Sequence, residues 1–198
     1  MVTSPPPRLL LLTDRSQTGG RPLADVLRAA VAGGARAVVL REQDLPVVAR
    51  AELASTLATV LHPVGGILLV ASGPDHGDGV HLAAGDAFPR PRPRIIGRSC
   101  HGDAELRAAA IEGCTYATLS PIFPSASKPG YGPPLGPGSL HDAPLPVVAL
   151  GGVTASNAGS CLAAGASGVA VMGPVMRAED PAAAVAALLD ALTTTVAR

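Results

Sequence analysis

The chain has few aromatic and few charged side chains for its 198 residues. Aromatic residues make up 2% of the sequence, tryptophan is absent, and charged residues account for 15%. The formal net charge is +0, and the sequence contains neither a basic run nor an aromatic platform. Proteins that bind nucleic acid rely on those two features, so we expect no nucleic-acid partner.

Cysteines and long apolar runs are also scarce. The three cysteines, Cys100, Cys114 and Cys161, are an odd number without CxxC spacing. This argues against a disulfide framework or a zinc site and indicates a reducing, cytoplasmic location. The apolar run 9–12 is too short to span a membrane and leads into Thr-Asp-Arg. We interpret it as a first strand, with no signal peptide and no membrane partner.

The sequence is rich in alanine, glycine and valine, and 47% of it is hydrophobic. That composition and length suit one well-buried domain over residues 1–198 with a parallel α/β sheet. Short apolar runs alternate with alanine-rich stretches of helical period. The runs predict strands at 9–12, 37–40, 67–70, 80–82, 95–98, 116–119, 147–150 and 169–172. The other stretches predict helices at 23–32, 47–61, 103–112, 156–164 and 181–192.

Eight strands with helices between most of them predict a (β/α)₈ TIM barrel, near the minimum length for that fold. A doubly wound open sheet is the second possibility, but no GxGxxG follows the first strand. Active sites of such barrels lie at the carboxyl ends of the strands. The expected strand ends are Arg41, Ser99, Ser120, Gly151 and Gly173.

The stretch 118–132 reads Thr-Leu-Ser-Pro-Ile-Phe-Pro-Ser-Ala-Ser-Lys-Pro-Gly-Tyr-Gly. Three prolines restrict this loop, so Ser125, Ser127 and Lys128 can be held toward one point. Two hydroxyl groups beside a compact cation suit an oxyanion. The residues alone are equally consistent with a surface loop whose lysine is solvated.

Two glycine pairs follow the last two predicted strands. Gly151-Gly152 and Gly173-Pro174 expose backbone N–H groups ahead of helices, where many barrels bind phosphate. Either pair alone could be a plain turn that needs a positive φ. Their presence at consecutive strand ends favours phosphate binding.

These motifs together resemble a known family. The run 120–128, Ser-Pro-Ile-Phe-Pro-Ser-Ala-Ser-Lys, is followed by Pro-Val-Val-Ala-Leu-Gly-Gly-Val-Thr-Ala-Ser-Asn at 146–157. Upstream lie Leu-Arg-Glu at 40–42, Gly-Val-His-Leu at 79–82 and Gly-Arg-Ser-Cys-His at 97–101. Over nearly its whole length the chain resembles thiamine phosphate synthase and its thiazole tautomerase relatives.

The resemblance implies an enzyme of thiamine biosynthesis that joins a pyrimidine methyl diphosphate to a thiazole phosphate and releases diphosphate. It implies small phosphorylated substrates and Mg²⁺ as the cofactor, and it permits a homodimer. Matching positions assign Arg41 and Lys128 to the diphosphate and Asp86 to the metal. Ser125, Ser127, Gly152 and Gly173 match positions that contact the thiazole phosphate, and Ser99 and Gly151 are further substrate-binding candidates.

The chain also departs from the family pattern. The family motif Gln-Leu-Arg-Glu-Lys reads Val-Leu-Arg-Glu-Gln at 39–43, and the family's Asn-Asp-Arg after the third strand is replaced by Ala-Ser-Gly at 71–73. A second metal carboxylate is therefore missing unless Asp75 or Asp78 replaces it. Two alternatives follow: a metal-independent thiazole phosphate tautomerase, or a non-catalytic barrel that binds a thiazole or thiamine phosphate.

A histidine could transfer protons in the site, and two lie at the expected active face: His101, just beyond the fifth predicted strand, and His76, in the loop after the third. The alternative role of His101 is to hydrogen-bond and cap the following helix, and the alternative for His76 is an ordinary solvated side chain. His81 lies on a predicted strand, where a structural role is the simpler interpretation. Cys100 is interpreted as a small packed residue.

Overall fold

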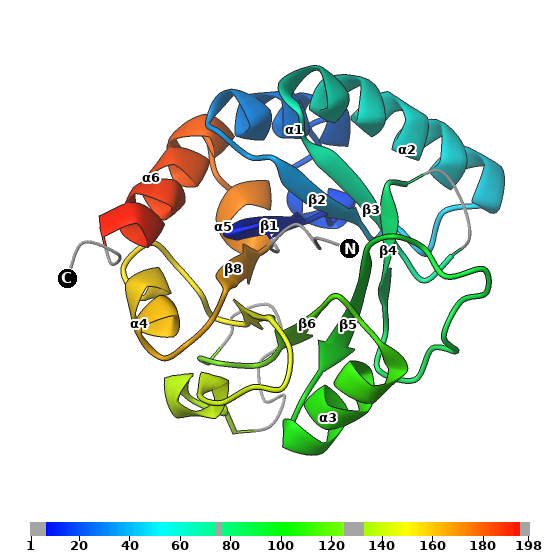
Figure 1. The fold of residues 1–198 in the computed structure, drawn as a ribbon. Coiled ribbons are helices and arrows are strands. Elements are labelled where there is room, and N and C mark those ends of the chain that lie inside the picture. Colours follow the sequence, from blue (N-terminus) through cyan, green and yellow to red (C-terminus); the bar gives the residue numbers. More distant parts are fainter. Residues whose placement is uncertain (1–6, 74–76, 125–132, 195–198) are drawn as a thin grey trace.

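The computed structural model describes residues 7–73, 77–124 and 133–194. Its eight strands form one closed barrel, in which every neighbouring pair is parallel (Figure 1). Closure comes from β1 pairing with β8, with Leu10 beside Ala170. The (β/α)₈ prediction is confirmed and the open sheet is excluded. The strands are β1 (Leu9–Leu12), β2 (Ala37–Leu40), β3 (Ile67–Ala71), β4 (Gly79–Leu82), β5 (Ile96–Cys100), β6 (Tyr116–Leu119), β7 (Val147–Leu150) and β8 (Gly168–Val171).

Helices cover the outside of the barrel unevenly, as Figure 1 shows. They are α1 (Leu23–Ala32), α2 (Val47–Leu61), α3 (Asp103–Glu112), α4 (Ala158–Ala163), α5 (Gly173–Met176) and α6 (Pro181–Thr194). The segment 83–95 after β4 is irregular instead, and the segment 133–146 before β7 contains only the 3₁₀ turn η3 (Pro137–Leu140). A further 3₁₀ turn, η1 (Arg15–Gln17), follows β1, and η2 (His62–Val64) follows α2.

The predicted elements are all present, with differences at their ends. The predicted helix 156–164 begins later, at Ala158, because the Asn157 side chain holds a turn ahead of it. Asn157 Oδ1 accepts a hydrogen bond from Thr154 N–H at 2.8 Å, and Nδ2 donates to the Gly152 carbonyl at 3.0 Å. The four-residue helix α5 was not predicted, because a Gly-Pro start and one turn of chain give no helical period.

Along each strand, side chains point alternately to a core between the strands and the helices and to a core inside the barrel. Outward-facing residues of the strands pack against the helices, and inward-facing ones fill the barrel. The inner cluster contains Leu10, Leu12, Ala37, Val39, Leu69, Ala71, Tyr116, Val148 and Ala170. Inward residues near the carboxyl ends of the strands therefore form the floor of the barrel mouth. No helix among the described residues is long and apolar enough to cross a membrane.

Candidate active site

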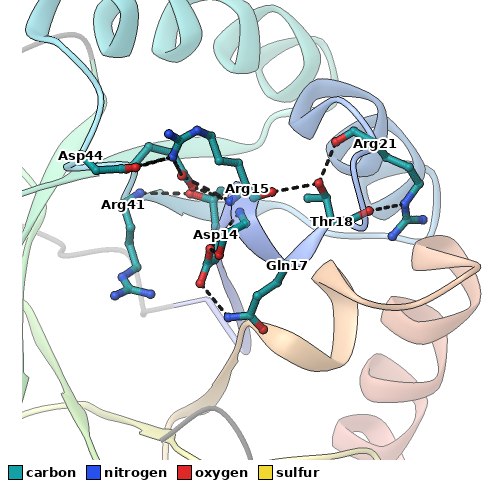
Figure 2. Close-up of polar contacts among 10 residues, drawn as sticks. Asp14, Arg15, Gln17, Thr18, Arg21, Arg41 and Asp44 are labelled. Carbon is teal, nitrogen blue, oxygen red and sulfur yellow. Dashed lines mark hydrogen bonds and ion pairs between the residues drawn. The ribbon is translucent and has the colours of Figure 1, made fainter.

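Arg41 lies at the mouth of the barrel, directly after β2. Its backbone N–H donates a hydrogen bond at 3.0 Å to Oγ1 of Thr13, the residue after β1. Its side chain extends away from the contacts around Arg15 (Figure 2), and Nη1 lies 2.9 Å from Sδ of Met172, the residue after β8. The guanidinium is therefore at the carboxyl edge of the strands, where the sequence predicted it.

Ion pairs and hydrogen bonds fix the rim after β1. The buried carboxylate of Glu42 accepts hydrogen bonds from the Arg15 N–H at 3.2 Å with both oxygens. Asp14 caps η1 by accepting a hydrogen bond from the Ser16 N–H at 3.1 Å. Burial raises the pKa of Asp14, but hydrogen bonds, that of the Ser16 hydroxyl first among them, outweigh it and lower the pKa. This carboxylate is thus charged at neutral pH.

A buried polar network lies on the inner wall near the mouth. His81 is 5% exposed. Its Nδ1 lies 2.8 Å from the Tyr116 hydroxyl, and its Nε2 lies 3.1 Å from Ser99 Oγ and 3.5 Å from Thr118 Oγ1. Burial, and secondly the positive charge of Arg41, lower the pKa of His81 to about 4. The imidazole is therefore neutral near pH 7. The sequence analysis did not predict that Tyr116 and Thr118 belong to this network, because within the strand 116–119 they look like ordinary strand residues.

Ser99 differs from its predicted place after the fifth strand. It lies within β5, which runs on to Cys100 because Cys100 still pairs with Leu119 of β6. The Ser99 hydroxyl faces the barrel interior, where it contacts His81. A contact between Ser99 and substrate stays a prediction.

Asp86 lies in the turn after β4 and borders a cavity of about 580 Å³. Its Oδ2 accepts hydrogen bonds from the Ser72 hydroxyl at 2.5 Å and from the Ala83 N–H at 2.8 Å. Ser72 follows β3, within the segment where the resembled family carries its second carboxylate. Among the described residues, no three His, Cys, Asp or Glu side chains gather as a metal site.

The possibility that Asp78 replaces the missing carboxylate is wrong. Asp78 precedes β4, and its Oδ2 accepts a hydrogen bond at 2.8 Å from the N–H of Leu68, near the start of β3. It also lies 3.1 Å from Nε2 of His62. These contacts place Asp78 at the amino ends of the strands, whereas Asp86 follows the carboxyl end of β4. Asp75, the other candidate, lies outside the described residues.

His101 follows β5 and faces the end of β6. Its Nδ1 lies 2.9 Å from the Ser120 carbonyl oxygen, and its backbone N–H donates to Glu105 Oε2 at 2.7 Å. The position at the carboxyl end matches the prediction. Both contacts also agree with the alternative of a residue that hydrogen-bonds ahead of helix α3. His76, the other histidine candidate, lies outside the described residues.

The glycines after β7 support the loop that follows β6. Gly151 and Gly152 have φ values of 91° and 65°, as the turn interpretation required. A Cβ on Gly151 would overlap Pro121, and one on Gly152 would overlap the Pro124 carbonyl. Gly173 is the first residue of α5, and the guanidinium of Arg177 covers the place of its missing Cβ. Whether these three residues donate to a phosphate is a prediction.

Three predicted residues, Ser125, Ser127 and Lys128, lie outside the described residues. The start of their loop is placed, because Ile122 N–H donates to the Leu150 carbonyl at 2.9 Å and Phe123 N–H donates to the Gly151 carbonyl at 3.0 Å. The described chain thus reaches Pro124 beside the glycines after β7.

A closed parallel barrel with an arginine, an aspartate and the Gly151-Gly152 turn at the carboxyl ends of its strands defines a (β/α)₈-barrel protein with the active-site layout of that class. Residues 9–175 match the thiamine monophosphate synthase family. The chain belongs to that family, whose members include transferases of thiamine biosynthesis.

Individual relatives agree with this assignment. The chain is 38% identical to a putative thiamine-phosphate synthase of Geobacter sulfurreducens, over 93% of each chain. It is 37% identical to a thiamine-phosphate synthase of Roseiflexus castenholzii, over 91% of this chain and 86% of the relative. The solved structure of thiamine phosphate pyrophosphorylase from Pyrococcus furiosus is similar with a TM-score of 0.84 and 28% identity, over 96% of each chain.

Proposed function

We propose that this protein is a thiamine-phosphate synthase, which joins a pyrimidine methyl diphosphate to a thiazole phosphate. The observation that carries the proposal is the guanidinium of Arg41 at the barrel mouth, 2.9 Å from Met172 and beside the start of α5, in a chain of the thiamine monophosphate synthase family. That position offers a fixed positive charge to a phosphorylated substrate.

The proposed reaction breaks the bond between the pyrimidine methylene carbon and a diphosphate oxygen. The diphosphate leaves with the electron pair, and the thiazole nitrogen donates its lone pair to the methylene carbon. Negative charge therefore grows on the leaving oxygen, and cations placed there stabilise the transition state. Arg41 and Lys128 are the residues we assign to this role.

Mg²⁺ would assist the same departure by neutralising charge on the diphosphate when it is bound. The described residues fit this ion, because Mg²⁺ takes oxygen ligands and is often held by one or two carboxylates together with substrate phosphates. Asp86 would supply the carboxylate, since its side-chain hydrogen bonds to other described residues both use Oδ2 and not Oδ1. The hydroxyl of Ser72 adds a neutral oxygen beside it.

The thiazole phosphate is assigned to the other side of the mouth. Ser125, Ser127 and the backbone of Gly152 and Gly173 would hold it, and Gly151 would shape the turn through its positive φ. The loop after β6 docks on the end of β7, which supports bringing these groups together. Ser99 would contact substrate from the inner wall.

The coupling step moves no proton, so His101 needs no acid or base role in it. We propose that His101 holds the Ser120 carbonyl at the start of the loop after β6, through its contact of 2.9 Å. The small phosphorylated substrates then meet a loop that is fixed at its first residues. A cytoplasmic location and a homodimer are further proposals, the former supported by three free, buried cysteines.

The test is a calorimetric titration of the thiazole phosphate-saturated protein with pyrimidine methyl diphosphate, with and without Mg²⁺, followed by chromatography for thiamine phosphate. We expect Mg²⁺-dependent heat and product. An Arg41→Gln variant should lose most product formation while still binding thiazole phosphate. Thiazole phosphate binding with no response to the diphosphate in the unmodified protein would contradict the synthase and favour a tautomerase or a non-catalytic binder.

A further inference from the structure

Arg98 is a buried arginine outside the barrel mouth. It lies on β5 beside Leu82 of β4 and is only 4% exposed. Its neighbours in sequence, Gly97 and Ser99, face the barrel interior, so alternation along the strand turns Arg98 to the outer wall. A guanidinium is charged at all relevant pH values and is costly to bury unless it is paired. Its partners should therefore reveal its role.

Those partners are backbone carbonyls of one turn. Arg98 Nη1 lies 3.0 Å from the Ala83 oxygen, 2.9 Å from the Ala84 oxygen and 3.0 Å from the Asp86 oxygen. The turn is closed by the Asp86 N–H, which donates to the Ala83 carbonyl at 3.2 Å. Hydrogen bonds from a charged donor are stronger than neutral ones. Arg98 thus binds the backbone of the turn that carries Asp86.

The other end of the guanidinium is tied to a helix. Nη2 lies 2.9 Å from Oε2 of Glu112, the last residue of α3, as an ion pair. Nε and Nη2 are both buried and neither makes a hydrogen bond among the described residues, so the contact with Glu112 is an ion pair only. Because β5 and α3 are regular elements, Arg98 links the irregular segment after β4 to the rigid part of the barrel.

The same turn also fixes the Asp86 carboxylate. Oδ2 accepts from the Ala83 N–H at 2.8 Å and from the Ser72 hydroxyl at 2.5 Å. The direction of the carboxylate therefore depends on where Ala83 lies, and Arg98 holds the Ala83 carbonyl. Among the described residues, Asp86 is the one carboxylate that we assign to the metal, so the geometry of the site depends on how this side chain is oriented.

We propose that Arg98 is a positioning residue for Asp86, which orients the Asp86 carboxylate to hold a divalent cation beside the diphosphate. This inference rests on the proposed function, since it requires Asp86 to bind the metal. Residues that orient metal ligands without touching the metal commonly change metal affinity about 10- to 100-fold when mutated.

The experiment is a titration with Mn²⁺ in the presence of inorganic diphosphate, followed by water proton relaxation, which reports ions held on a macromolecule. We expect Arg98→Met to weaken Mn²⁺ binding by about 10-fold or more. Arg98→Lys should recover part of this loss. The affinity for thiazole phosphate should stay within about twofold, because its proposed site is at β7 and β8.

Two further variants keep the inference testable. Arg107→Met removes an exposed arginine of α3 whose ion pair among the described residues is with Asp103 of the same helix, at 2.7 Å, and it should leave the Mn²⁺ affinity unchanged. Glu112→Gln keeps Arg98 but removes the charge of its partner. It should weaken Mn²⁺ binding, by less than Arg98→Met does, and it remains a test if Arg98→Met does not fold. If Arg98→Met folds and its Mn²⁺ affinity is unchanged, the inference is overturned. If Arg98→Met does not fold, unchanged Mn²⁺ affinity in Glu112→Gln overturns it. An unmodified protein that binds no Mn²⁺ would instead refute the proposed metal site itself.

Discussion

Folding changes the chemistry of His81 by burying its imidazole. It is in contact with Tyr116 and Ser99 and is almost fully removed from water. A buried neutral imidazole with both nitrogens in contact with hydroxyl groups avoids the cost of a buried charge. It also orients the Ser99 hydroxyl on the inner wall of the mouth.

The pKa of His81 predicts a stability change with pH. Its folded pKa is about 4 against 6.5 as the ordinary value, so between these values the unfolded chain binds more protons. The contribution of His81 to the free energy of unfolding should therefore be greatest above pH 6.5 and should fall as the pH drops toward 4. The loss is roughly 3 kcal/mol at most, at about 1.4 kcal/mol per pKa unit.

Urea unfolding at several pH values between 4 and 7 measures this loss. The matched variant is His81→Gln, which keeps a hydrogen-bonding side chain without a titrating group. Its stability should depend less steeply on pH than that of the unmodified chain. Parallel curves for the two proteins would show that His81 does not contribute to the slope.

Lys128 is the only lysine in the chain. If it grips a phosphorylated ligand, Lys128→Ala should weaken thiazole phosphate or diphosphate binding by about 1.5–3 kcal/mol, the usual range for a hydrogen bond to a charged group. Calorimetric titration gives the affinity directly, and Lys128→Arg serves as the charge-retaining control. Unchanged affinity in Lys128→Ala would mean that the loop 118–132 is not part of the grip.

At the scale of elements, β5 and β6 fit together because Gly97 has no side chain. The Tyr116 ring, 2% exposed, occupies the space where a Cβ on Gly97 would be. A tyrosine can therefore fill the barrel interior in a chain with few other large inner residues. The close approach also carries the Tyr116 hydroxyl to His81.

Gly97→Ala should be strongly destabilising, because the added Cβ would overlap the Tyr116 ring between two neighbouring strands. Overpacking of this kind costs about 1–3 kcal/mol and occasionally more. Thermal unfolding followed by circular dichroism measures the loss. Gly102→Ala is the control, since its Cβ would meet nothing within 4 Å, and it should unfold near the temperature of the unmodified protein. Equal losses in the two variants would contradict this account of β5 and β6.

The irregular segment after β4 shows how a barrel can lack a covering helix locally. Leu82 and Val80 still need partners on the outer wall, and they are 4% and 8% exposed. Arg98 donates hydrogen bonds to carbonyls of the turn, which in a helix would accept hydrogen bonds from the backbone. One buried arginine thus supplies the hydrogen bonds that a helix supplies to its own backbone elsewhere around the barrel.

For the molecule as a whole, the reactivity of the three cysteines measures how well the fold excludes solvent. Cys100, Cys114 and Cys161 are all free and buried. Burial raises the pKa of Cys100 to about 12 and that of Cys161 to about 11, and it raises that of Cys114 as well. Since the thiolate is the reactive form, the folded protein should react very slowly.

A thiol reagent such as dithiobis-nitrobenzoate should therefore label almost none of the three cysteines at pH 7.5 in the native protein, and all three in 6 M guanidinium. Absorbance of the released thiolate counts the modified residues. Rapid labelling of even one thiol in the native chain would show that its surroundings open readily.

The sequence by itself determined the architecture of this protein. Apolar runs such as 37–40 and 147–150 predicted strands that the structure reproduces, because a strand buried on both faces must be continuously apolar. The strand pattern also placed Arg41 at a strand end, where the structure has it. The family resemblance added only a metal role for Asp86, which stays a prediction. Strand ends shifted by one or two residues where a neighbouring strand prolonged the pairing, as at Cys100.

Only the tertiary structure decided which residues meet. Asp78 and Asp86 are eight residues apart in sequence, yet they belong to opposite ends of the barrel because β4 runs between them. Likewise, no local pattern could show that Arg98 binds the turn of Asp86, since that contact depends on the register between β4 and β5. Periodicity specifies which face a residue occupies, whereas closure of the barrel specifies its partners.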